Sequence, residues 1–531
     1  MLPLIPRPDR LDLKAGTLSA AGGLEPTGDV PAPWLRATRR RLAGWGVLDP
    51  DGPPLEVVAD PARAPESYRL EVTSDRVVLT AADEPGLAHA LGALAQLLAP
   101  GAHGPGGHDG PFDLPCLELE STPRFPHRGA MLDVSRHYFG VPVLRDLVET
   151  LALFGYNRLH LHLSDDQGWR VESFVEPRLV QVATHRPGTT FGPDGPTDPT
   201  PHGGYLALAD LRRLTDHART LGMEVVAEID LPGHTTALRA ALPELGRPGE
   251  QVDVLQTVGA GGSSVAPLPR TVEVLDRVLA ELVDATGIRY VHLGGDECDM
   301  GWWEDDPEVV AHREALGLRT GEDLHAWFLR ELAARLEARG VSVLMWDEAF
   351  VTGGLTPAAT VTAWRGDAVA ERAARAGALV RTPLFPTYFN FDQSTDPDEP
   401  RAQGGPITLR DVMRFDVAPA TWDDTARRNV RGGQFQVWTE WITTREELEY
   451  AVFPRALAMA EVLWRGAVDD EDELEERILR ALDVLDARGV AYRPLDGPRP
   501  WQRGGLGRRR RATGDDIEAT RRWVESVSDR A

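Results

Sequence analysis

Two acidic side chains stand next to each other in the stretch HLGGDECDM, residues 292–300, directly after an apolar run. Asp296 and Glu297 follow a pair of glycines there. Adjacent carboxylates repel each other, and burial strengthens the repulsion, so a chain that keeps both either solvates them or uses them. A plainer interpretation places them at a helix N-terminus, where the helix dipole favours acids. Their position at the end of a strand-like run favours acid–base chemistry.

A second pattern could bind a metal ion. His160 and His162 stand two apart on a strand-like segment, so they face the same side, and two aspartates follow closely. Metal-dependent hydrolases use H-x-H at a strand end, and His234 and His292 could complete such a ligand set. A lone H-x-H match is weak. Two histidines that fill the protein interior and hydrogen-bond to their neighbours are the plainer alternative, and the spacing alone leaves both open.

Tryptophan is abundant, with 14 residues against 14 Phe and only 8 Tyr. Trp169, Trp346, Trp364 and Trp438 all stand where strand-like segments end. Core packing best explains any single one of them. Four that face one opening suggest a stacking surface for flat apolar faces, such as those of sugar rings.

The elements that must position these residues alternate between short apolar strands and helices from about residue 124 onward. Helical segments are expected at 143–153, 208–221, 272–286, 323–339 and 368–376. The eight expected strands are 128–133, 158–163, 224–229, 288–293, 341–346, 360–364, 378–381 (running on toward Tyr388) and 433–438. Alternation of this kind indicates a parallel sheet, and eight repeats predict a (β/α)8 TIM barrel of the α/β class. Every expected strand ends in polar or aromatic residues, as the active mouth of such a barrel requires.

The sequence predicts further parts before and after the barrel. For residues 1–118 it predicts a small α+β domain with a hairpin over 68–72 and 76–80 and a helix over 86–98. A Gly- and Pro-rich linker is expected at 99–113. We expect the barrel domain at 119–495 and a partly helical C-terminal extension at 496–531, where the arginine run 508–511 suits a surface patch. The long intervals 171–204 and 391–429 are expected to be loops over one mouth of the barrel.

Composition excludes several classes of function. The net charge of −25 argues against a nucleic-acid partner, because the phosphate backbone would be repelled. Only two cysteines occur, so no disulfide framework is expected. No apolar run approaches the length of a membrane span, and the first residues lack the pattern of a signal peptide. A cytoplasmic protein is the expectation, with secretion by another route as the alternative.

Five motifs, in order along the chain, resemble glycoside hydrolase family 20, the β-N-acetylhexosaminidases. They are FPHRGAMLDVSRHYF (125–139), HLHLSDDQGWR (160–170), EIDLPGH (228–234), HLGGDE (292–297) and GGQFQVWTE (432–440). The resemblance covers about residues 120–465, and residues 1–118 resemble the small domain that precedes the barrel in this family. It implies removal of a terminal non-reducing N-acetylglucosamine or N-acetylgalactosamine from an oligosaccharide, with retention, no metal and no other cofactor.

The resemblance also gives the two adjacent acids separate roles. Enzymes of this family are substrate-assisted, so the 2-acetamido oxygen of the sugar is the nucleophile and an oxazolinium ion forms. Glu297 matches the general acid and base, which needs a raised pKa near neutral pH. Asp296 matches the residue that accepts the acetamide N–H and stabilises the developing positive charge. An ionised Asp296 is expected to help keep Glu297 protonated.

Further roles carry over position by position. Tyr388 matches the donor to the acetamide oxygen, Arg136 the residue that binds the 3- and 4-hydroxyls, and Glu440 the residue that binds the 4- and 6-hydroxyls. Asn390 stands where many relatives have Asp, which weakens stabilisation of positive charge. Three tryptophans, Trp346, Trp364 and Trp438, match residues that enclose the acetamide methyl and the sugar face. Asp165 and His234 match a pair that supports the general acid.

Three hypotheses remain in competition. The leading one is the exo-β-N-acetylhexosaminidase. The second is a metal-dependent TIM-barrel hydrolase that uses His160 and His162. The third is a carbohydrate-binding relative without turnover, which the presence of both acids and Tyr388 disfavours.

Overall fold

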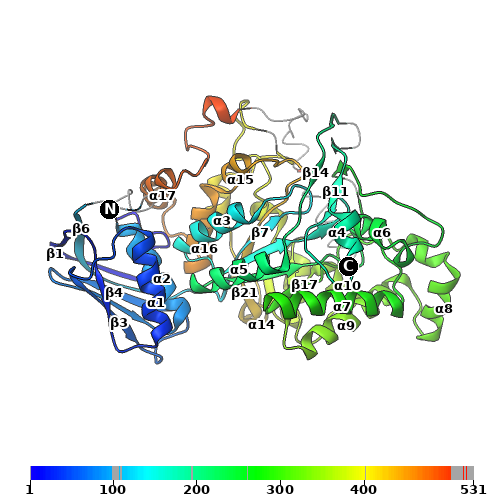
Figure 1. The fold of residues 1–531 in the computed structure, drawn as a ribbon, viewed down its shortest axis with the longest axis horizontal. Helices are drawn as coiled ribbons and strands as arrows, with labels where there is room; N and C mark the ends of the chain where they lie inside the picture. The colour runs from blue at the N-terminus through cyan, green and yellow to red at the C-terminus, as the bar shows by residue number, and fades with distance from the viewer. Residues whose placement is uncertain are drawn as a thin grey trace.

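The chain folds around two sheets, an open six-stranded sheet and a closed eight-stranded barrel (Figure 1). The structure is a computed structural model that describes residues 2–98, 107, 110–192, 195–259, 261–400, 402–503, 518, 519 and 522. The arginine run at 508–511 and most of the expected linker at 99–113 lie outside these residues. The division into domains at 118 and 495 stays a prediction.

The N-terminal sheet has the strand order β1-β6-β4-β5-β3-β2. The expected hairpin is present, because β4 pairs antiparallel with β5 and buries alternate side chains. The helix expected at 86–98 is α2, which Asp83 caps by accepting the backbone N–H of Gly86. The elements are β1 (Arg10–Ala20), β2 (Glu25–Thr27), α1 (Ala32–Gly44), β3 (Pro54–Ala59), β4 (Tyr68–Val72), β5 (Val77–Ala81), α2 (Glu84–Leu97) and β6 (Phe112–Ser121).

The predicted TIM barrel is confirmed. Eight strands close on themselves in the order β15-β17-β18-β19-β20-β21-β7-β8, and every neighbouring pair is parallel. Each strand overlaps the range expected from the sequence. The strands are β7 (His127–Asp133), β8 (Arg158–His162), β15 (Glu224–Glu228), β17 (Tyr290–His292), β18 (Ser342–Trp346), β19 (Thr360–Ala363), β20 (Leu379–Arg381) and β21 (Val430–Val437).

One strand ends earlier than expected. The segment after β20 does not run on as a strand toward Tyr388, because the short helix α12 (Leu384–Thr387) intervenes. Pro383 and Pro386 flank or lie within this helix, and proline has no N–H to donate to a strand ladder. Tyr388 still reaches the barrel, through an isolated bridge to Gln436 of β21.

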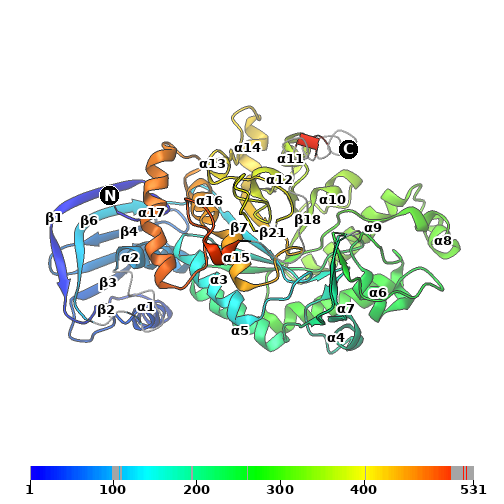
Figure 2. The ribbon, with the colours of Figure 1, turned by 90° about the horizontal axis from the view of Figure 1, so that it is seen from above.

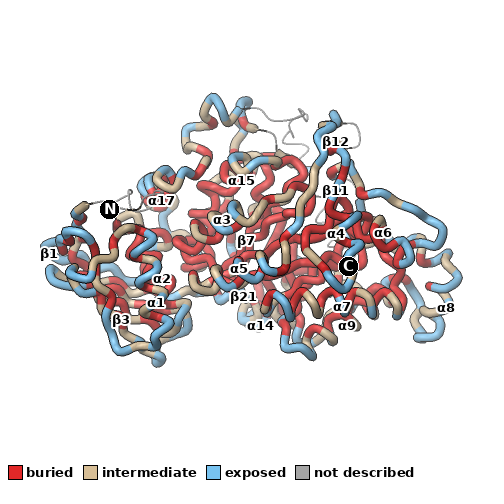
Figure 3. Tube along the Cα trace, viewed as in Figure 1, coloured by how far each residue is buried: buried red, intermediate tan, exposed pale blue. Residues whose placement is uncertain are grey.

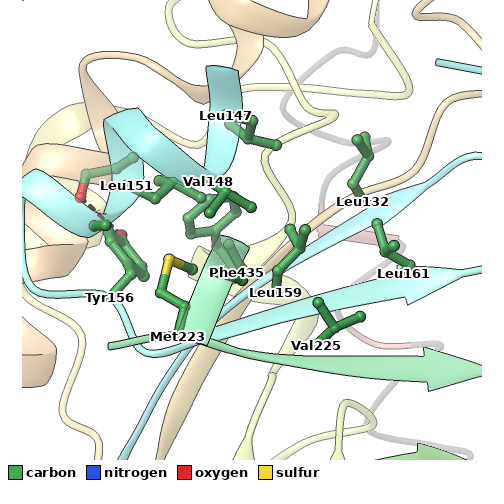
Figure 4. Packing of buried hydrophobic residues seen from close by; sticks show 14 of the residues in the cluster. Leu132, Leu147, Val148, Leu151, Tyr156, Leu159, Leu161, Met223, Val225 and Phe435 are labelled. Atoms are coloured by element: carbon green, nitrogen blue, oxygen red, sulfur yellow. Dashed lines mark hydrogen bonds between the residues drawn. The ribbon is translucent and has the colours of Figure 1, made fainter. Parts of the chain in front are cut away.

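Helices cover the outside of the barrel with apolar faces of helical period. In α3 (Val141–Leu153), Leu147, Val148 and Leu151 point toward Leu159 and Leu161 of β8 (Figure 4). Each fully buried side chain of this size contributes about 1.5–3 kcal/mol by leaving water. The barrel strands are consequently buried along most of their length, whereas the outer helix faces and loops are exposed (Figure 3).

The two long intervals carry secondary structure of their own. The interval 171–204 holds α4 and four short strands, of which β12 pairs in parallel with β16 from another loop. The interval 391–429 holds α13 and α14. These elements are α4 (Arg178–Ala183), β11 (His185–Arg186), β12 (Thr189–Phe191), β13 (Thr197–Asp198), β14 (His202–Gly203), β16 (Thr257–Val258), α13 (Leu409–Met413) and α14 (Asp424–Asn429).

The remaining elements complete the (β/α) repeats or follow the last strand. They are β9 (Ser164–Asp165), β10 (Gly168–Trp169), α5 (Leu208–Thr220), α6 (Thr236–Ala241), η2 (Pro243–Leu245), α7 (Pro269–Thr286), η3 (Gly301–Glu304), α8 (Pro307–Ala315), α9 (Gly321–Ala338), α10 (Asp347–Thr352), α11 (Asp367–Ala376), α15 (Arg445–Val452), α16 (Arg455–Arg465), α17 (Glu471–Ala487) and η4 (Pro500–Gln502). Among the described residues, no helix is both long enough and apolar enough to cross a membrane. The cytoplasmic location stays a prediction.

A buried polar network joins the N-terminal sheet to the barrel. Glu66, in the loop before β4, pairs with Arg128 of β7 and with His89 of α2, and accepts an amide hydrogen of Asn157. The helix α17 lies between the sheet and the barrel (Figure 2). Its Arg477 donates to the backbone oxygen of Leu4 at 2.8 Å. The sheet therefore contacts the barrel where strands β7 and β8 begin, opposite to the mouth at which they end.

Candidate active site

The carboxyl ends of all eight barrel strands contribute side chains to one mouth. Each residue to which the family resemblance gives a role lies at or just after such an end, because parallel strands in a barrel all end at the same face. In strand order these residues are Arg136 (after β7), Asp165 (β8), His234 (β15), Asp296 and Glu297 (β17), Trp346 (β18), Trp364 (β19), Tyr388 and Asn390 (β20), and Trp438 and Glu440 (β21).

A left-handed turn presents the two adjacent acids. Gly294 and Gly295 have φ values of +66° and +102°, and Glu297 itself has φ of +44°. A Cβ at Gly294 would overlap the Oδ1 atom of Asp230, so only glycine fits there. A non-glycine residue with positive φ is strained, and such strain is often found at functional sites. The turn sends Asp296 inward and leaves Glu297 at the mouth.

The two acids have different surroundings. The side chain of Asp296 is 12% exposed and that of Glu297 is 51% exposed. Burial raises the pKa of Asp296 to about 6; nearby His234 opposes the rise, whereas Glu228 and Glu297 add to it. A hydrogen bond from His234 lowers the pKa of Glu297 despite partial burial. These directions are the reverse of the sequence expectation, because the fold places the cationic imidazole of His234 beside the more exposed acid.

His234 stands between two inner aspartates and the outer acid pair. Its Nδ1 lies 3.4 Å from Asp165 Oδ1 and 3.2 Å from Asp166 Oδ2. Its Nε2 lies 3.5 Å from Glu297 Oε2 and 3.9 Å from Asp296 Oδ2. Although burial opposes it, these carboxylates raise the pKa of His234 well above the ordinary value. The expected pair of Asp165 and His234 is therefore together, with the imidazole directed at Glu297.

Arg136 and Glu440 form another part of the mouth. Arg136 bonds Asp165 at 2.7 Å and lies 3.4 Å from Asp133, and its guanidinium stands 5.2 Å from the ring centre of Trp438. Burial raises the pKa of Glu440, and the charge of Arg136 opposes that rise. A cation and a carboxylate side by side can together hold the hydroxyl groups of a sugar.

Aromatic rings line the site. The ring of Trp438 lies 6.2 Å from that of Trp346 and 6.3 Å from that of Tyr388. The indole N–H of Trp346 is fixed by Glu228 at 2.8 Å, and that of Trp364 by Glu348 at 3.1 Å. Burial raises the pKa of Tyr388 well above its usual range, so its hydroxyl stays protonated and can donate.

Three buried oxygen atoms of the residues singled out from the sequence lack a hydrogen-bond partner among the described residues. They are Asp296 Oδ1, Asn390 Oδ1 and Glu440 Oε2. Buried polar atoms without partners are costly, so each such atom calls for an explanation. All three are acceptors when the two acids are ionised, and all three belong to the group singled out from the sequence. A ligand with several N–H and O–H donors satisfies them.

The histidines of the rival metal site are engaged in hydrogen bonds. His160 and His292 lie with Glu228 in a group whose ligand atoms are within 4.8 Å of one another. However, the Nδ1 of His292 accepts the N–H of Gly294 at 3.0 Å, and its Nε2 bonds Thr362. His160 Nδ1 accepts from Gln434 at 3.1 Å.

His162 directs both of its nitrogens at carboxylates, those of Glu228 and Asp165. The sixth nitrogen, His160 Nε2, has no hydrogen-bond partner among the described residues and lies 3.1 Å from Glu228 Oε2. Because the other five nitrogens of the three histidines are hydrogen-bonded, the interpretation that histidines fill the barrel is favoured over a metal centre.

Sequence reasoning missed three acids of the site. Glu228 ends β15 and accepts from Trp346, Asp230 lies against the turn at Gly294, and Glu348 fixes Trp364. Burial and the charge of Asp296 raise the pKa of Asp230 well above the usual value. The only signal was position, since all three stand within two residues of a strand end.

Comparisons with known proteins identify the kind of catalytic domain. A model described as the catalytic domain of glycosyl hydrolase family 20 matches residues 125–467. A β-hexosaminidase of Porphyromonas gingivalis is 32% identical over 407 residues, which cover 74% of this chain and 50% of that protein. A β-N-acetylhexosaminidase of Cellulomonas fimi is 32% identical over 434 residues, which cover 80% of each. The chain thus spans half the length of the Porphyromonas relative and most of the Cellulomonas one.

Solved structures agree with these matches. An exo β-N-acetylglucosaminidase of family 20 from Vibrio harveyi, in complex with N-acetylglucosamine, has a TM-score of 0.81 at 27% identity and covers 93% of this chain and 78% of its own. An N-acetyl-β-hexosaminidase of Streptomyces plicatus has a TM-score of 0.78 at 28% identity, with coverage of 93% and 97%.

Proposed function

The chain belongs to glycosyl hydrolase family 20, and from this premise we propose that it is an exo-acting β-N-acetylhexosaminidase. The substrate is an oligosaccharide with a terminal, non-reducing, β-linked N-acetylglucosamine or N-acetylgalactosamine. The 2-acetamido oxygen of that sugar attacks the anomeric carbon, the bond to the leaving oxygen breaks, and the oxazolinium ion forms. Water then opens this ion with overall retention, and no metal ion takes part.

The acetamide group is held by Asp296 and Tyr388. The Oδ1 of Asp296, unpartnered among the described residues, accepts the acetamide N–H, and the ionised carboxylate stabilises the positive charge that develops there. The protonated hydroxyl of Tyr388 donates to the acetamide oxygen and fixes it for attack. Trp346, Trp364 and Trp438 enclose the methyl group and the sugar face.

Glu297 transfers the protons. In the first step it gives its proton to the glycosidic oxygen, and in the second it accepts a proton from the attacking water. A bound sugar covers the half-exposed carboxyl and removes water from it, which raises its pKa from the lowered value of the free site. His234 stabilises the carboxylate that remains after the proton has left.

Contacts to the ring hydroxyls explain the exo action. Arg136 binds the 3- and 4-hydroxyls, and Glu440 binds the 4- and 6-hydroxyls through its free Oε2. These hydroxyls must carry no further sugar, so only a terminal residue fits. Asn390 adds a neutral acceptor near the acetamide, in place of a charged one.

The observation that carries the proposal is the set of three unpartnered acceptors around the acid pair. The first experiment measures hydrolysis of 4-nitrophenyl β-N-acetylglucosaminide and β-N-acetylgalactosaminide, with the plain β-glucoside as the matched control. We expect turnover of the acetamido sugars alone, inhibition by a cyclic thiazoline that mimics the bicyclic intermediate, and no effect of a chelator. Equal cleavage of the β-glucoside, or activity that a chelator abolishes and zinc restores, contradicts the proposal.

A second measurement separates turnover from mere binding. Calorimetric binding of N-acetylglucosamine without hydrolysis of any aryl glycoside supports a carbohydrate-binding relative instead. Glu297→Gln should lose far more activity on poor leaving groups than on nitrophenol, because nitrophenolate leaves without a proton.

A further inference from the structure

A chain of alternating acids and bases runs from the barrel interior to the mouth. Glu228 Oε2 bonds His162 Nδ1 at 2.6 Å, and His162 Nε2 bonds Asp165 Oδ2 at 2.8 Å. The next contacts join Asp165 Oδ1 to His234 at 3.4 Å and His234 to Glu297 at 3.5 Å. The inner members, Glu228 and His162, belong to neighbouring strands β15 and β8, and their side chains are fully buried.

The inner half of this chain controls how Asp165 is held. Both His162 and Arg136 bond the Oδ2 atom of Asp165, at 2.8 and 2.7 Å. Its other oxygen, Oδ1, accepts the backbone N–H of Asp166 at 2.6 Å and is the atom that faces His234. Because one oxygen is occupied from two sides, the carboxylate cannot rotate without breaking charged hydrogen bonds.

His162 must be an imidazolium in this arrangement. Both of its nitrogens face carboxylate oxygens, and each nitrogen donates only when the ring carries two protons. Although burial opposes it, the charges of Glu228 and Asp165 raise the pKa of His162 well above the ordinary value. Its ring also packs against Trp438 at 5.0 Å.

The other groups that face the chain do not replace His162. On Glu228 these are Trp346, which donates at 2.8 Å, and His160 and His292, each 3.1 Å away. Burial lowers the pKa of His292 to about 4, so this ring is neutral. At the outer end, Asp166 and Asp296 face His234, and Asp133 faces Arg136.

We propose that His162 and Glu228 are positioning residues for the general acid, acting through Asp165 and His234. The inference rests on the proposed function and adds residues to it. His162 holds Asp165 so that its Oδ1 orients the imidazole of His234, and the oriented imidazole stabilises the carboxylate that Glu297 becomes when it protonates the leaving oxygen. Glu228 holds His162 in its charged form. We expect the loss of either group to lower activity about 10–100-fold, the range typical of hydrogen-bond partners that orient the ligands of metal sites.

The test is the dependence of kcat/KM on the leaving group. His162→Gln keeps a hydrogen-bond donor but loses the charge. We expect it to lower kcat/KM about 10–100-fold for a methyl or N-acetylglucosaminyl aglycone, and less than threefold for dinitrophenyl, which needs no protonation. His292→Gln is the matched control, since His292 is equally buried and also faces Glu228. Any loss there should be the same for every leaving group.

A double-mutant cycle decides whether the effect passes through His234. In a His234→Gln background, His162→Gln should add less than a threefold further loss on the poor leaving groups. A loss in His162→Gln that is uniform across leaving groups, or a full additional loss in that background, overturns the proposal. If His162→Gln does not fold, Glu228→Gln is measured in the same way, with the same expected selectivity.

A readout that needs no turnover keeps the two proposals distinguishable. The imidazole ¹⁵N resonances of His162 at pH 8 should show both nitrogens protonated, and Glu228→Gln should remove one proton. A neutral His162 in the wild-type protein overturns this inference even if the enzyme is active. A wild-type protein with a charged His162 but without turnover of any acetamido sugar overturns the proposed function instead.

Discussion

Asp296 and Glu297 are neighbours in the chain, yet they share one proton unevenly in the free site. Burial favours the proton on Asp296, and the hydrogen bond from His234 favours an ionised Glu297. The proposed mechanism needs the opposite distribution. In that mechanism the substrate provides it, because the acetamide N–H stabilises an ionised Asp296 while the sugar removes water from Glu297. We therefore expect the two acids to titrate as one pair, with substrate binding moving the proton from Asp296 to Glu297.

This arrangement predicts the sign of the pH dependence. The active free enzyme holds one proton on the pair, and that proton leaves above pH about 6, where Asp296 titrates. We expect kcat/KM to fall about tenfold per pH unit above that point. In Asp296→Asn only Glu297 titrates, with a lowered pKa, so the falling limb should move to lower pH and overall activity should drop about 100- to 1000-fold. Profiles of both proteins from pH 4 to 9 check this, and an unmoved limb contradicts it.

Asn390 offers a gain of function. Its Oδ1 is buried and unpartnered among the described residues, close to where positive charge develops on the acetamide in the proposed mechanism. A charged hydrogen bond is roughly twice as strong as a neutral one. Asn390→Asp should therefore lower the activation free energy by about 1 kcal/mol, which raises kcat roughly fivefold. The added charge also favours protonation of Asp296, so the comparison belongs at pH 8. Asn429→Asp, before β21 at the other end of the barrel, is the control and should leave kcat unchanged.

The turn between β17 and the acid pair is an element whose geometry allows only glycine. Gly294→Ala places a Cβ in the left-handed region and against Asp230, so the turn must move. A displacement of about 1 Å at a catalytic group costs about 100-fold in rate. Gly287→Ala is the matched control, because its φ of +67° is the same but its nearest neighbour is 3.6 Å away.

The control should lose about 1–2 kcal/mol in the free energy of unfolding, with activity intact. Equal activity losses in the two variants count against a role for the clash.

Strands and helices that a pattern within their own segment indicates could be predicted from the sequence. Elements that form through contacts between segments far apart in the chain could not. Strand and helix periodicity predicted all eight barrel strands, and the polar strand ends predicted which residues meet. The pairing of β12 with β16 joins segments more than sixty residues apart, so the loop 171–204 gave no sign of it. The protonation states of the two acids were predicted wrongly from the sequence for the same reason. The pKa of Glu297 depends on His234, which is distant in sequence and adjacent only in the folded barrel.

At the scale of the whole molecule, the N-terminal sheet is joined to the barrel by a buried charge network, far from the mouth. Although burial opposes it, Arg128 and His89 hold the pKa of Glu66 well below its usual range. The ionised carboxylate therefore stabilises the fold at neutral pH. Loss of one partner of a buried ion pair leaves the other charge unpaired and costs about 3–5 kcal/mol. The guanidinium of Arg128, stacked 4.8 Å from the ring centre of Trp464, is the charge that would be stranded.

Glu66→Gln should therefore lower the free energy of unfolding by about 3–5 kcal/mol at pH 7 without changing kcat/KM at 25 °C, since the mouth lies at the opposite strand ends. Glu71→Gln is the control, because Glu71 pairs with Arg69 on the surface, where each side chain is 36% exposed. Glu71→Gln should lower the free energy of unfolding by less than about 1 kcal/mol. The contribution of Glu66 is fully present above its unfolded pKa of about 4.3 and is lost as the pH falls toward the much lower folded pKa. The difference in unfolding free energy between the wild type and Glu66→Gln should therefore shrink by about 1 kcal/mol between pH 7 and pH 3.5. Urea unfolding at both pH values measures this, and a difference that is unchanged or larger at pH 3.5 contradicts the electrostatic account.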